Sequence, residues 1–193
     1  MKRIRNGIKV FIAGSRRLSR LNKDVKSRID NIVDKGFTVV VGDANGVDKA
    51  VQRYLSSRNY RDVVVFCMEG GCRNNIGDWP TQTIRADERG RRDFGYYSTK
   101  DRAMAKEADY GLMLWDGRSR GTLGNIVHLV REGKAVVVYI APDKCFYTLR
   151  GPNHLLEILA RFDHAALRRI DRELQAAAMG SSSSRKAYTP PLF

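Results

Sequence analysis

Three short segments of the sequence combine glycine with serine, threonine, arginine or aspartate, and each lies at the end of an apolar run. They are GSR at residues 14–16, GDANGVD at 42–48 and WDGRSRGTLGN at 115–125. Glycine lets a backbone approach a ligand, arginine binds anions, and the free N–H groups of a helix starting at Gly121-Thr122 suit a phosphate. We therefore expect a phosphate-bearing ligand, contacted by Gly14, Ser15, Arg16, Gly46, Asp48, Ser119, Gly121 and Thr122.

Each segment also has a structural explanation when it is taken alone. Glycine after a strand is common in turns, and Asp48 suits the first turn of a helix. Trp115 suits a hydrophobic core, although a purine or pyrimidine could also stack on it, so it joins the ligand-contact candidates. The occurrence of three such segments in one chain favours ligand binding.

Two kinds of site are not expected. No G-x-G-x-x-G follows the first apolar run and no G-x-x-x-x-G-K-[ST] occurs, so the sequence predicts neither a conventional NAD or FAD site nor a P-loop, and no cofactor. Cys67 and Cys72 lack the second ligand pair that structural zinc normally uses, so no metal site is expected.

Alternating strands and helices would bring the three segments together. Apolar runs predict strands at 8–14, 37–43, 62–68, 110–116 and 135–141. Helices are predicted at 22–35, 47–57, 98–108, with Ser98 or Thr99 as N-cap, and 122–131, with Thr122 capping. This order predicts an α/β, Rossmann-like fold with a five-stranded parallel sheet flanked by helices. Residues 69–97 show no regular pattern and are expected to form a functional or mobile loop.

The pattern changes after Pro142. We expect a nucleotide-binding domain at residues 1–141, a helical extension at 142–179 and a disordered tail at 180–193. The extension has helical patterns at 153–162 and 164–178 and no predicted strand. The apolar face of the second helix is expected to form a homo-oligomer interface.

The composition narrows the class of protein. The chain has 193 residues, with 35 basic and 21 acidic side chains and a net charge of +14, which attracts polyanions such as nucleic acid or a phosphorylated ligand. Its apolar content of 42% excludes a wholly disordered chain. No run approaches a membrane span or a signal-peptide core, and three cysteines make no disulfide framework. We expect a cytoplasmic protein without membrane contact.

Taken together, the motifs resemble the SLOG superfamily. They are GSR at 14–16, Gly42-x-x-x-Gly46-x-Asp48, the polar segment Lys100 to Met104, and Ser119-x-Gly121-Thr122, and the resemblance covers residues 8–141. This Rossmann-like group includes DprA, the Lonely Guy phosphoribohydrolases and YspA-like proteins, the last being closest in layout. The resemblance implies a nucleotide or nucleotide-derived ligand with Gly121 and Thr122 on its phosphate, and it adds Lys100 as a contact.

The resemblance also raises the question of catalysis. Relatives that cleave an N-glycosidic bond share G-T-x-x-E, and this chain has Asn125 at the glutamate position. An amide cannot act as general base or nucleophile, so either the chain only binds or another carboxylate replaces the glutamate. Asp116, Asp101 and Glu69 are the candidates.

A second hypothesis is a DprA-like module that binds single-stranded nucleic acid. Arginine-rich segments and nearby aromatic residues suit a phosphate backbone and stacked bases. Basic residues crowd the first strand and helix, at Lys2, Arg3, Arg5, Lys9, Arg16, Arg17, Arg20, Lys23, Lys26 and Arg28. The long loop adds Arg85, Arg89, Arg91 and Arg92, among which Asp87, Glu88 and Asp93 reduce the local positive charge.

Overall fold

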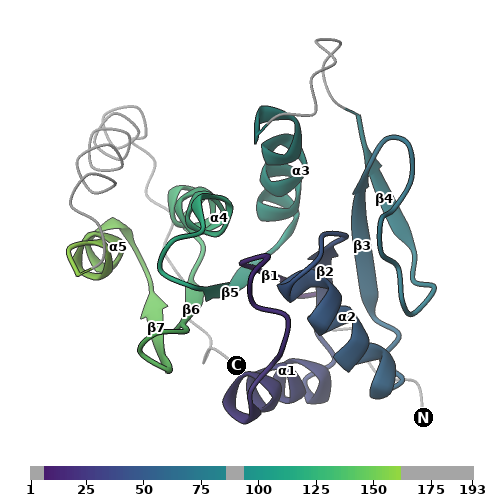
Figure 1. Cartoon of the computed structure of the whole chain (residues 1–193), viewed down its shortest axis with the longest axis horizontal. Helices are drawn as coiled ribbons and strands as arrows, with labels where there is room; N and C mark the ends of the chain where they lie inside the picture. Colours follow the sequence, from purple (N-terminus) through teal and green to yellow (C-terminus); the bar gives the residue numbers. More distant parts are fainter. Residues whose placement is uncertain (1–6, 86–93, 162–193) are drawn as a thin grey trace.

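A seven-stranded sheet forms the centre of the computed structural model, which describes residues 7–85 and 94–161 (Figure 1). The strands are β1 (Lys9–Gly14), β2 (Thr38–Gly42), β3 (Val63–Met68), β4 (Thr81–Ile84), β5 (Tyr110–Trp115), β6 (Val136–Ile140) and β7 (Cys145–Leu149). Their order across the sheet is β4-β3-β2-β1-β5-β6-β7. Every neighbouring pair is parallel except β6 and β7, which are antiparallel.

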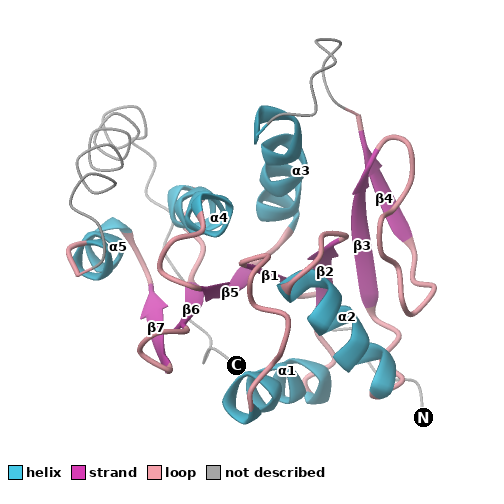
Figure 2. Cartoon of the chain, viewed as in Figure 1, coloured by secondary structure: helices cyan, strands magenta, loops and turns pink. Residues whose placement is uncertain are grey.

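Helices cover both faces of this sheet. In the described residues they are α1 (Lys23–Asp34), α2 (Val47–Ser57), α3 (Phe94–Glu107), α4 (Arg120–Arg131) and α5 (Pro152–Leu159). Helices α1 and α2 pack on one face, and α3, α4 and α5 pack on the other (Figure 2). The predicted α/β class and Rossmann-like architecture are therefore confirmed.

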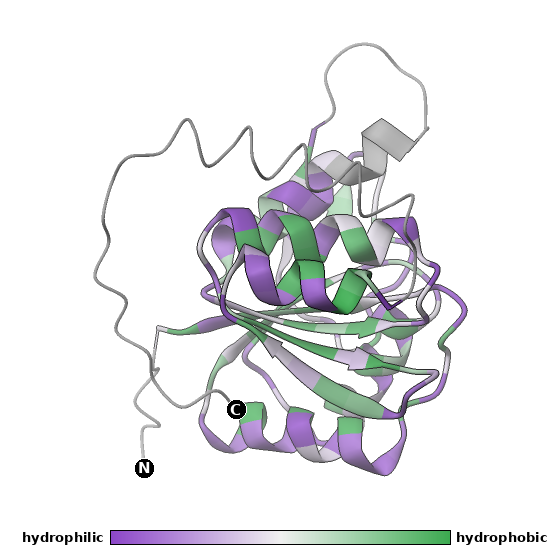
Figure 3. Cartoon of the chain, turned by 90° about the vertical axis from the view of Figure 1, so that its left-hand side faces the viewer, coloured by the Kyte–Doolittle hydropathy of each residue, from purple (hydrophilic) through white to green (hydrophobic). Residues whose placement is uncertain are grey.

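Burial on both faces explains why the central strands are so apolar. Val39, Val40 and Val41 of β2 are each 0% exposed, because side chains that alternate in direction along the strand meet a helix layer on either side. Figure 3 shows the hydrophobic strands between two helix layers, and the helix below the sheet is hydrophilic on its outer side.

The five predicted parallel strands are present, and the structure adds one strand at each edge. Strand β4, with the sequence TQTI, lies inside the segment 69–97, and its polar and mostly exposed side chains leave no apolar pattern to detect. Strand β7 lies inside the segment 142–179, for which only helices were predicted. It turns back from β6 at Lys144, which has φ 53°, and pairs with β6 from Cys145 to Leu149.

Helix boundaries differ from prediction at two places. Helix α3 begins at Phe94, earlier than the predicted N-cap at Ser98 or Thr99. Helix α4 begins at Arg120, because Ser119 is the N-cap residue and Thr122 lies inside the first turn. The prediction that Thr122 caps this helix was wrong.

Several predictions fall outside the described residues. These are the helix at 164–178 with its oligomer interface, the tail at 180–193, and the loop arginines Arg89, Arg91 and Arg92. Within residues 7–85 and 94–161, no helix is long and apolar enough to cross a membrane.

Candidate functional site

The strand order contains a reversal between β1 and β5. From β1 the chain builds outward through β2, β3 and β4, and it then returns to the other side of β1 with β5, β6 and β7. In open α/β sheets, ligands bind outside the carboxyl ends of the strands at such a switch point, because the two loops there diverge. The loops in question are residues 15–22, between β1 and α1, and 116–119, between β5 and α4.

A hydrogen bond joins these two loops across the switch point. The Oγ–H of Ser15 donates to Oδ2 of Asp116 at 2.8 Å, and the backbone N–H of Arg17 donates to Oγ of Ser15 at 3.1 Å. The other carboxylate oxygen, Oδ1, accepts from the N–H groups of Arg118 at 3.0 Å and Ser119 at 2.7 Å. Asp116 therefore fixes the shape of both loops.

These bonds also keep Asp116 ionised. Partial burial raises the pKa of Asp116, but the hydrogen bonds from Ser15, Ser119 and Arg118 outweigh it, so that the net pKa lies below its ordinary value. The carboxylate accepts three bonds from its own chain, which is the geometry of a positioning residue.

Ser119 and Thr122 organise the start of α4. Oγ of Ser119 accepts from the backbone N–H of Thr122 at 3.3 Å and from its Oγ1–H at 3.0 Å. Thr122 is buried, whereas Gly121 is half-buried. The first turn of α4 thus faces the switch point with its N–H groups, as an anion site requires.

Gly14 and Gly46 allow the loops to pack closely against each other. A Cβ on Gly14 would collide with the carbonyl oxygen of Leu114 and lie 2.7 Å from Cγ2 of Val47. Gly46 has φ 86°, and a Cβ there would collide with the backbone of Arg16. Both glycines are therefore required by contacts within the chain.

A second polar cluster lies at the ends of β2 and β3. Asp43 follows β2, is 2% exposed and accepts from Nζ of Lys100, which is 3% exposed, at 2.5 Å. The guanidinium of Arg73 donates to both oxygens of Asp43, at 2.7 Å from Nη2 and 3.1 Å from Nε. Burial alone would raise the pKa of Asp43, but the bonds from Arg73 and Lys100 outweigh it and hold the pKa well below its usual range.

Two further carboxyl groups face the same ammonium group. Burial raises the pKa of Asp48 to about 7, and the neighbouring charge of Lys100 opposes that rise only in part. Burial likewise raises the pKa of Asp101 to about 6 against the charges of Lys100, Arg16 and Arg73. Lys100 and Asp48, both predicted as ligand contacts, thus lie buried in this cluster.

The loop after β3 is fastened to this cluster. Cys67 at the end of β3 forms a disulfide with Cys72, with Cα atoms 5.0 Å apart, a single bond in a chain whose three cysteines predicted no disulfide framework. The side chain of Asn74 donates to the carbonyl of Asp43 at 2.7 Å, and Gln52 donates to Gly42 at 2.8 Å and to Asn74 at 3.2 Å. This part of the predicted mobile loop is held by specific contacts.

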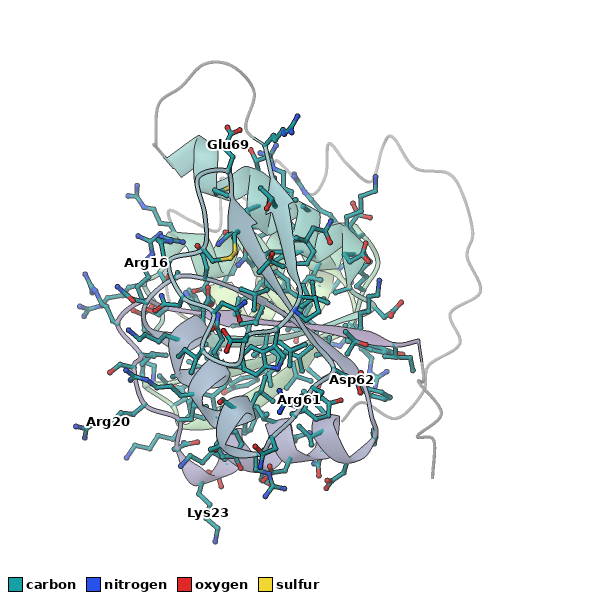
Figure 4. All side chains as sticks on the ribbon, turned by 90° about the vertical axis from the view of Figure 1, so that its right-hand side faces the viewer. Arg16, Arg20, Lys23, Arg61, Asp62 and Glu69 are labelled. Carbon is teal, nitrogen blue, oxygen red and sulfur yellow. A yellow bond between two sulfur atoms is a disulfide. The ribbon has the colours of Figure 1, made fainter. Side chains whose placement is uncertain are left out.

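The remaining candidates have these positions. Trp115 is 3% exposed, and its indole N–H donates to the carbonyl of Ser119 at 3.1 Å, which matches its explanation as a core residue. Asn125 is 5% exposed on α4. Glu69 is exposed and directly follows β3, and Figure 4 shows its side chain away from those of Arg16 and Arg20. Asp116 belongs to the switch point, whereas Asp101 belongs to the second cluster.

Exposed arginines surround the switch point. The segment 15–21 contains arginine at 16, 17 and 20 and no acidic residue, and the segment 116–120 adds Arg118 and Arg120. All five side chains are exposed. Arg16, Arg17 and Arg20 were noted in the sequence as a basic patch, whereas Arg118 and Arg120 were missed, although their place beside the glycine-rich turn could have indicated them.

The opposite edge of the sheet is balanced in charge. Exposed basic residues there stand next to acidic ones in the sequence, as Asp34-Lys35, Arg61-Asp62 and Lys106-Glu107. Figure 4 shows Arg16 and Arg20 on one side of the molecule and the Arg61-Asp62 pair away from them. The basic residues of these three pairs thus have acidic neighbours, whereas the segment 15–21 has none.

This chain resembles known proteins in its fold. No protein-family model matches it, and no curated protein matches it. Among solved structures, it resembles DNA processing protein A of Helicobacter pylori, described for its single-stranded DNA binding mode, with a TM-score of 0.55 and 16% identity over 88% of this chain and 81% of that one.

A second solved structure, DNA processing protein A (DprA) of Streptococcus pneumoniae, gives a TM-score of 0.50 and 14% identity over 68% of this chain. The match spans 50% of that longer chain. At these identities the likeness concerns the fold. The chain has the Rossmann-like fold found in the DprA proteins.

Proposed function

We propose that this protein binds single-stranded nucleic acid along the carboxyl edge of its sheet, at the switch point between β1 and β5. The observation that carries the proposal is the cluster of exposed arginines on the two loops that Asp116 holds together. Arginine side chains and helix N–H groups are the donors that proteins use for phosphate oxygens. The fold shared with a single-stranded DNA-binding protein supports the same proposal.

The arrangement suits a chain of phosphates better than one phosphate. Arg16, Arg17 and Arg20 follow each other along one loop, and Arg118 and Arg120 continue across the switch point on the next. A polyanion gains affinity from each additional cation, because each contact releases a counterion from the strand. A mononucleotide has too few charges to use all of these side chains.

A free nucleotide is the second candidate, and the N-terminus of α4 favours it. The first-turn N–H groups beside Ser119 suit a terminal phosphate, as the YspA-like layout also implies. Hydrolysis of an N-glycosidic bond has weaker support, since Asn125 cannot act as a base and Asp116 already accepts three hydrogen bonds.

Titration of a fluorescent oligothymidylate at several salt concentrations tests the proposal. We expect affinity to fall as salt rises, with a logarithmic slope that becomes shallower by about 2 when Arg16, Arg17 and Arg20 are all replaced by glutamine, because single strands contribute about 0.7 per phosphate contact. The matched control replaces Lys35, Arg61 and Lys106 by glutamine on the opposite edge and removes the same charge.

The two triple variants give a direct contrast. The proposal is supported if only the first variant binds more weakly and shows a shallower dependence of affinity on salt. Equal losses in both variants, or absence of binding by the unmodified protein at about 50 mM salt, where electrostatic binding is strong, would overturn it. Competition by nucleoside monophosphates at low concentration would favour the second candidate instead.

A further inference from the structure

A cavity of about 130 Å³ opens beside the switch point. It lies between the loop from Leu18 to Asn22, the start of α1 and the ends of β5 and β6. Its walls are mainly apolar and include Leu18, Val25, Leu114 and Ala141. Leu18 and Ala141 are only half-buried, so the cavity reaches the surface.

One end of the cavity is polar. The hydroxyl of Tyr139 accepts a hydrogen bond from the side-chain amide of Asn22 at 2.7 Å, and both residues line the cavity. The other side-chain atom of Asn22, its Oδ1, accepts from the N–H of Val25 as the N-cap of α1. This bond holds the amide in place, and the phenolic O–H of Tyr139 can still donate a hydrogen bond.

The rim of the cavity is basic. Arg20 is exposed and lines it, and it belongs to the same loop as Arg16 and Arg17. If one ring of a ligand occupied the cavity, the rest of that ligand would therefore pass over the arginines that we propose as phosphate contacts.

We propose that this cavity receives one nucleobase of the bound strand. The inference rests on the proposed function. A flat heterocycle needs apolar contact on its faces and hydrogen-bonding groups at its edge, and the cavity offers Leu18, Leu114 and Ala141 for the first and the Tyr139 and Asn22 pair for the second.

The size of the cavity limits what can occupy it. Sites for whole small-molecule ligands measure roughly 300–1,000 Å³, so that a cavity of about 130 Å³ accommodates one ring system and leaves sugar and phosphate outside. A base can enter only when it is unpaired, as in single strands whose bases are turned away from their neighbours. The cavity thus gives a reason for preferring single strands over duplexes.

Binding of two strands of equal length tests the inference. One is an oligothymidylate, and the other is the corresponding abasic chain with the same phosphates and no bases. We expect the unmodified protein to bind the first at least about fivefold more tightly, which is the lower end of what one base contributes by stacking.

Ala141→Leu fills the cavity without changing charge. We expect the ratio of the two affinities to fall to about one in this variant. Ala160→Leu, on the exposed end of α5, is the matched control and keeps the ratio of the unmodified protein. Leu18→Phe fills the cavity from the opposite wall and replaces Ala141→Leu if thermal unfolding shows that Ala141→Leu does not fold.

The possible results separate the two proposals. Equal affinity of the unmodified protein for both strands, or an unchanged ratio in a folded filling variant, would overturn the base cavity and leave phosphate binding intact. Absence of binding to either strand would overturn the proposed function and the cavity together.

Discussion

Two regions at the carboxyl edge of the same sheet use charged side chains in opposite ways. At the ends of β2 and β3, Asp43 forms ion pairs with Lys100 and Arg73, and Asp43 and Lys100 are almost inaccessible. At the ends of β1 and β5, arginines are exposed around a network centred on Asp116. The first region holds loops together, and the second exposes charge at the place where we propose that nucleic acid binds.

The difference shows that a polar residue at a strand end is not sufficient evidence for a ligand site. Lys100 and Asp48 were predicted as ligand contacts together with Arg16, yet Lys100 and Asp48 are buried, whereas Arg16 is exposed. We infer that substitutions in the β2–β3 cluster change stability, whereas substitutions around the switch point change binding.

The largest effect is expected for Lys100→Met. Asp43 keeps the guanidinium of Arg73 in this variant, but it loses the buried ammonium group, and the lost charge-assisted hydrogen bond costs up to about 3 kcal/mol in the free energy of unfolding. Lys106→Met, an exposed lysine on the same helix, is the control and is expected to change it by less than about 0.5 kcal/mol. Chemical denaturation measures both, and equal stability of the two variants would abolish the distinction between the regions.

The next effect concerns pH. Because the pKa of Asp48 is about 7 in the folded chain and 3.8 ordinarily, the folded state binds a proton that the unfolded state releases between these values. Stability therefore falls as pH rises from about 4 to 7, by up to about 1.4 kcal/mol per pH unit for one proton. Asp48→Asn removes this part of the fall.

Denaturation between pH 4 and 8 measures the profile. In Asp48→Asn, stability still falls to a smaller extent as pH rises, because the pKa of Asp101 is also raised, to about 6. The exposed Asp34→Asn serves as control. Identical profiles for Asp48→Asn and the unmodified protein would show that Asp48 is not buried as a neutral acid.

A smaller loss of stability is expected for Cys72→Ser. The disulfide to Cys67 closes a short loop, and losing it costs about 2 kcal/mol on the chain-entropy account. The loss is expected without reductant and should vanish when dithiothreitol is added to both proteins. Cys145→Ser, which changes the free cysteine, is the control. If reductant leaves the unmodified protein as stable as before, the bond contributes nothing to this region.

The smallest effect is expected for Ser119→Ala. It removes the N-cap acceptor of α4 and costs about 1 kcal/mol of stability, whereas Ser119→Asp keeps an acceptor and should cost less. Ser27→Ala, on the exposed side of α1, is the control. Thermal unfolding of the three variants checks the order, and equal midpoints for Ser119→Ala and Ser27→Ala would contradict the capping role.

Local patterns predicted most of the sheet and its helices. Runs such as Val39 to Val41 are unambiguous because both faces of a central strand are buried. The first helix, predicted at 22–35, runs from Lys23 to Asp34. The edge strand β4 was missed because its exposed polar residues carry no such signal. Ser119 and Thr122 are both good capping residues, and the extended backbone of Ser119, with ψ 112°, together with its bond from the N–H of Thr122 makes Ser119 the cap.

The candidate site was predictable only in part. Ser15 and Asp116 were identified as residues at strand ends, but their mutual bond joins positions 101 apart in sequence, which spacing cannot reveal. Asp43 was missed as the partner of Lys100 for the same reason, since 57 positions separate them. Tyr139 appeared as a strand residue, and its place in a cavity depends on how α1 packs against β6.

Amide hydrogen exchange, measured on the full chain with and without saturating oligothymidylate, tests the central claim most directly. We predict slower exchange at residues 15–20 and 116–123 in the complex, and no change at residues 72–76 around the second cluster. Slower exchange at 72–76 with none in the two switch-point loops would contradict the assignment of binding to the β1–β5 edge.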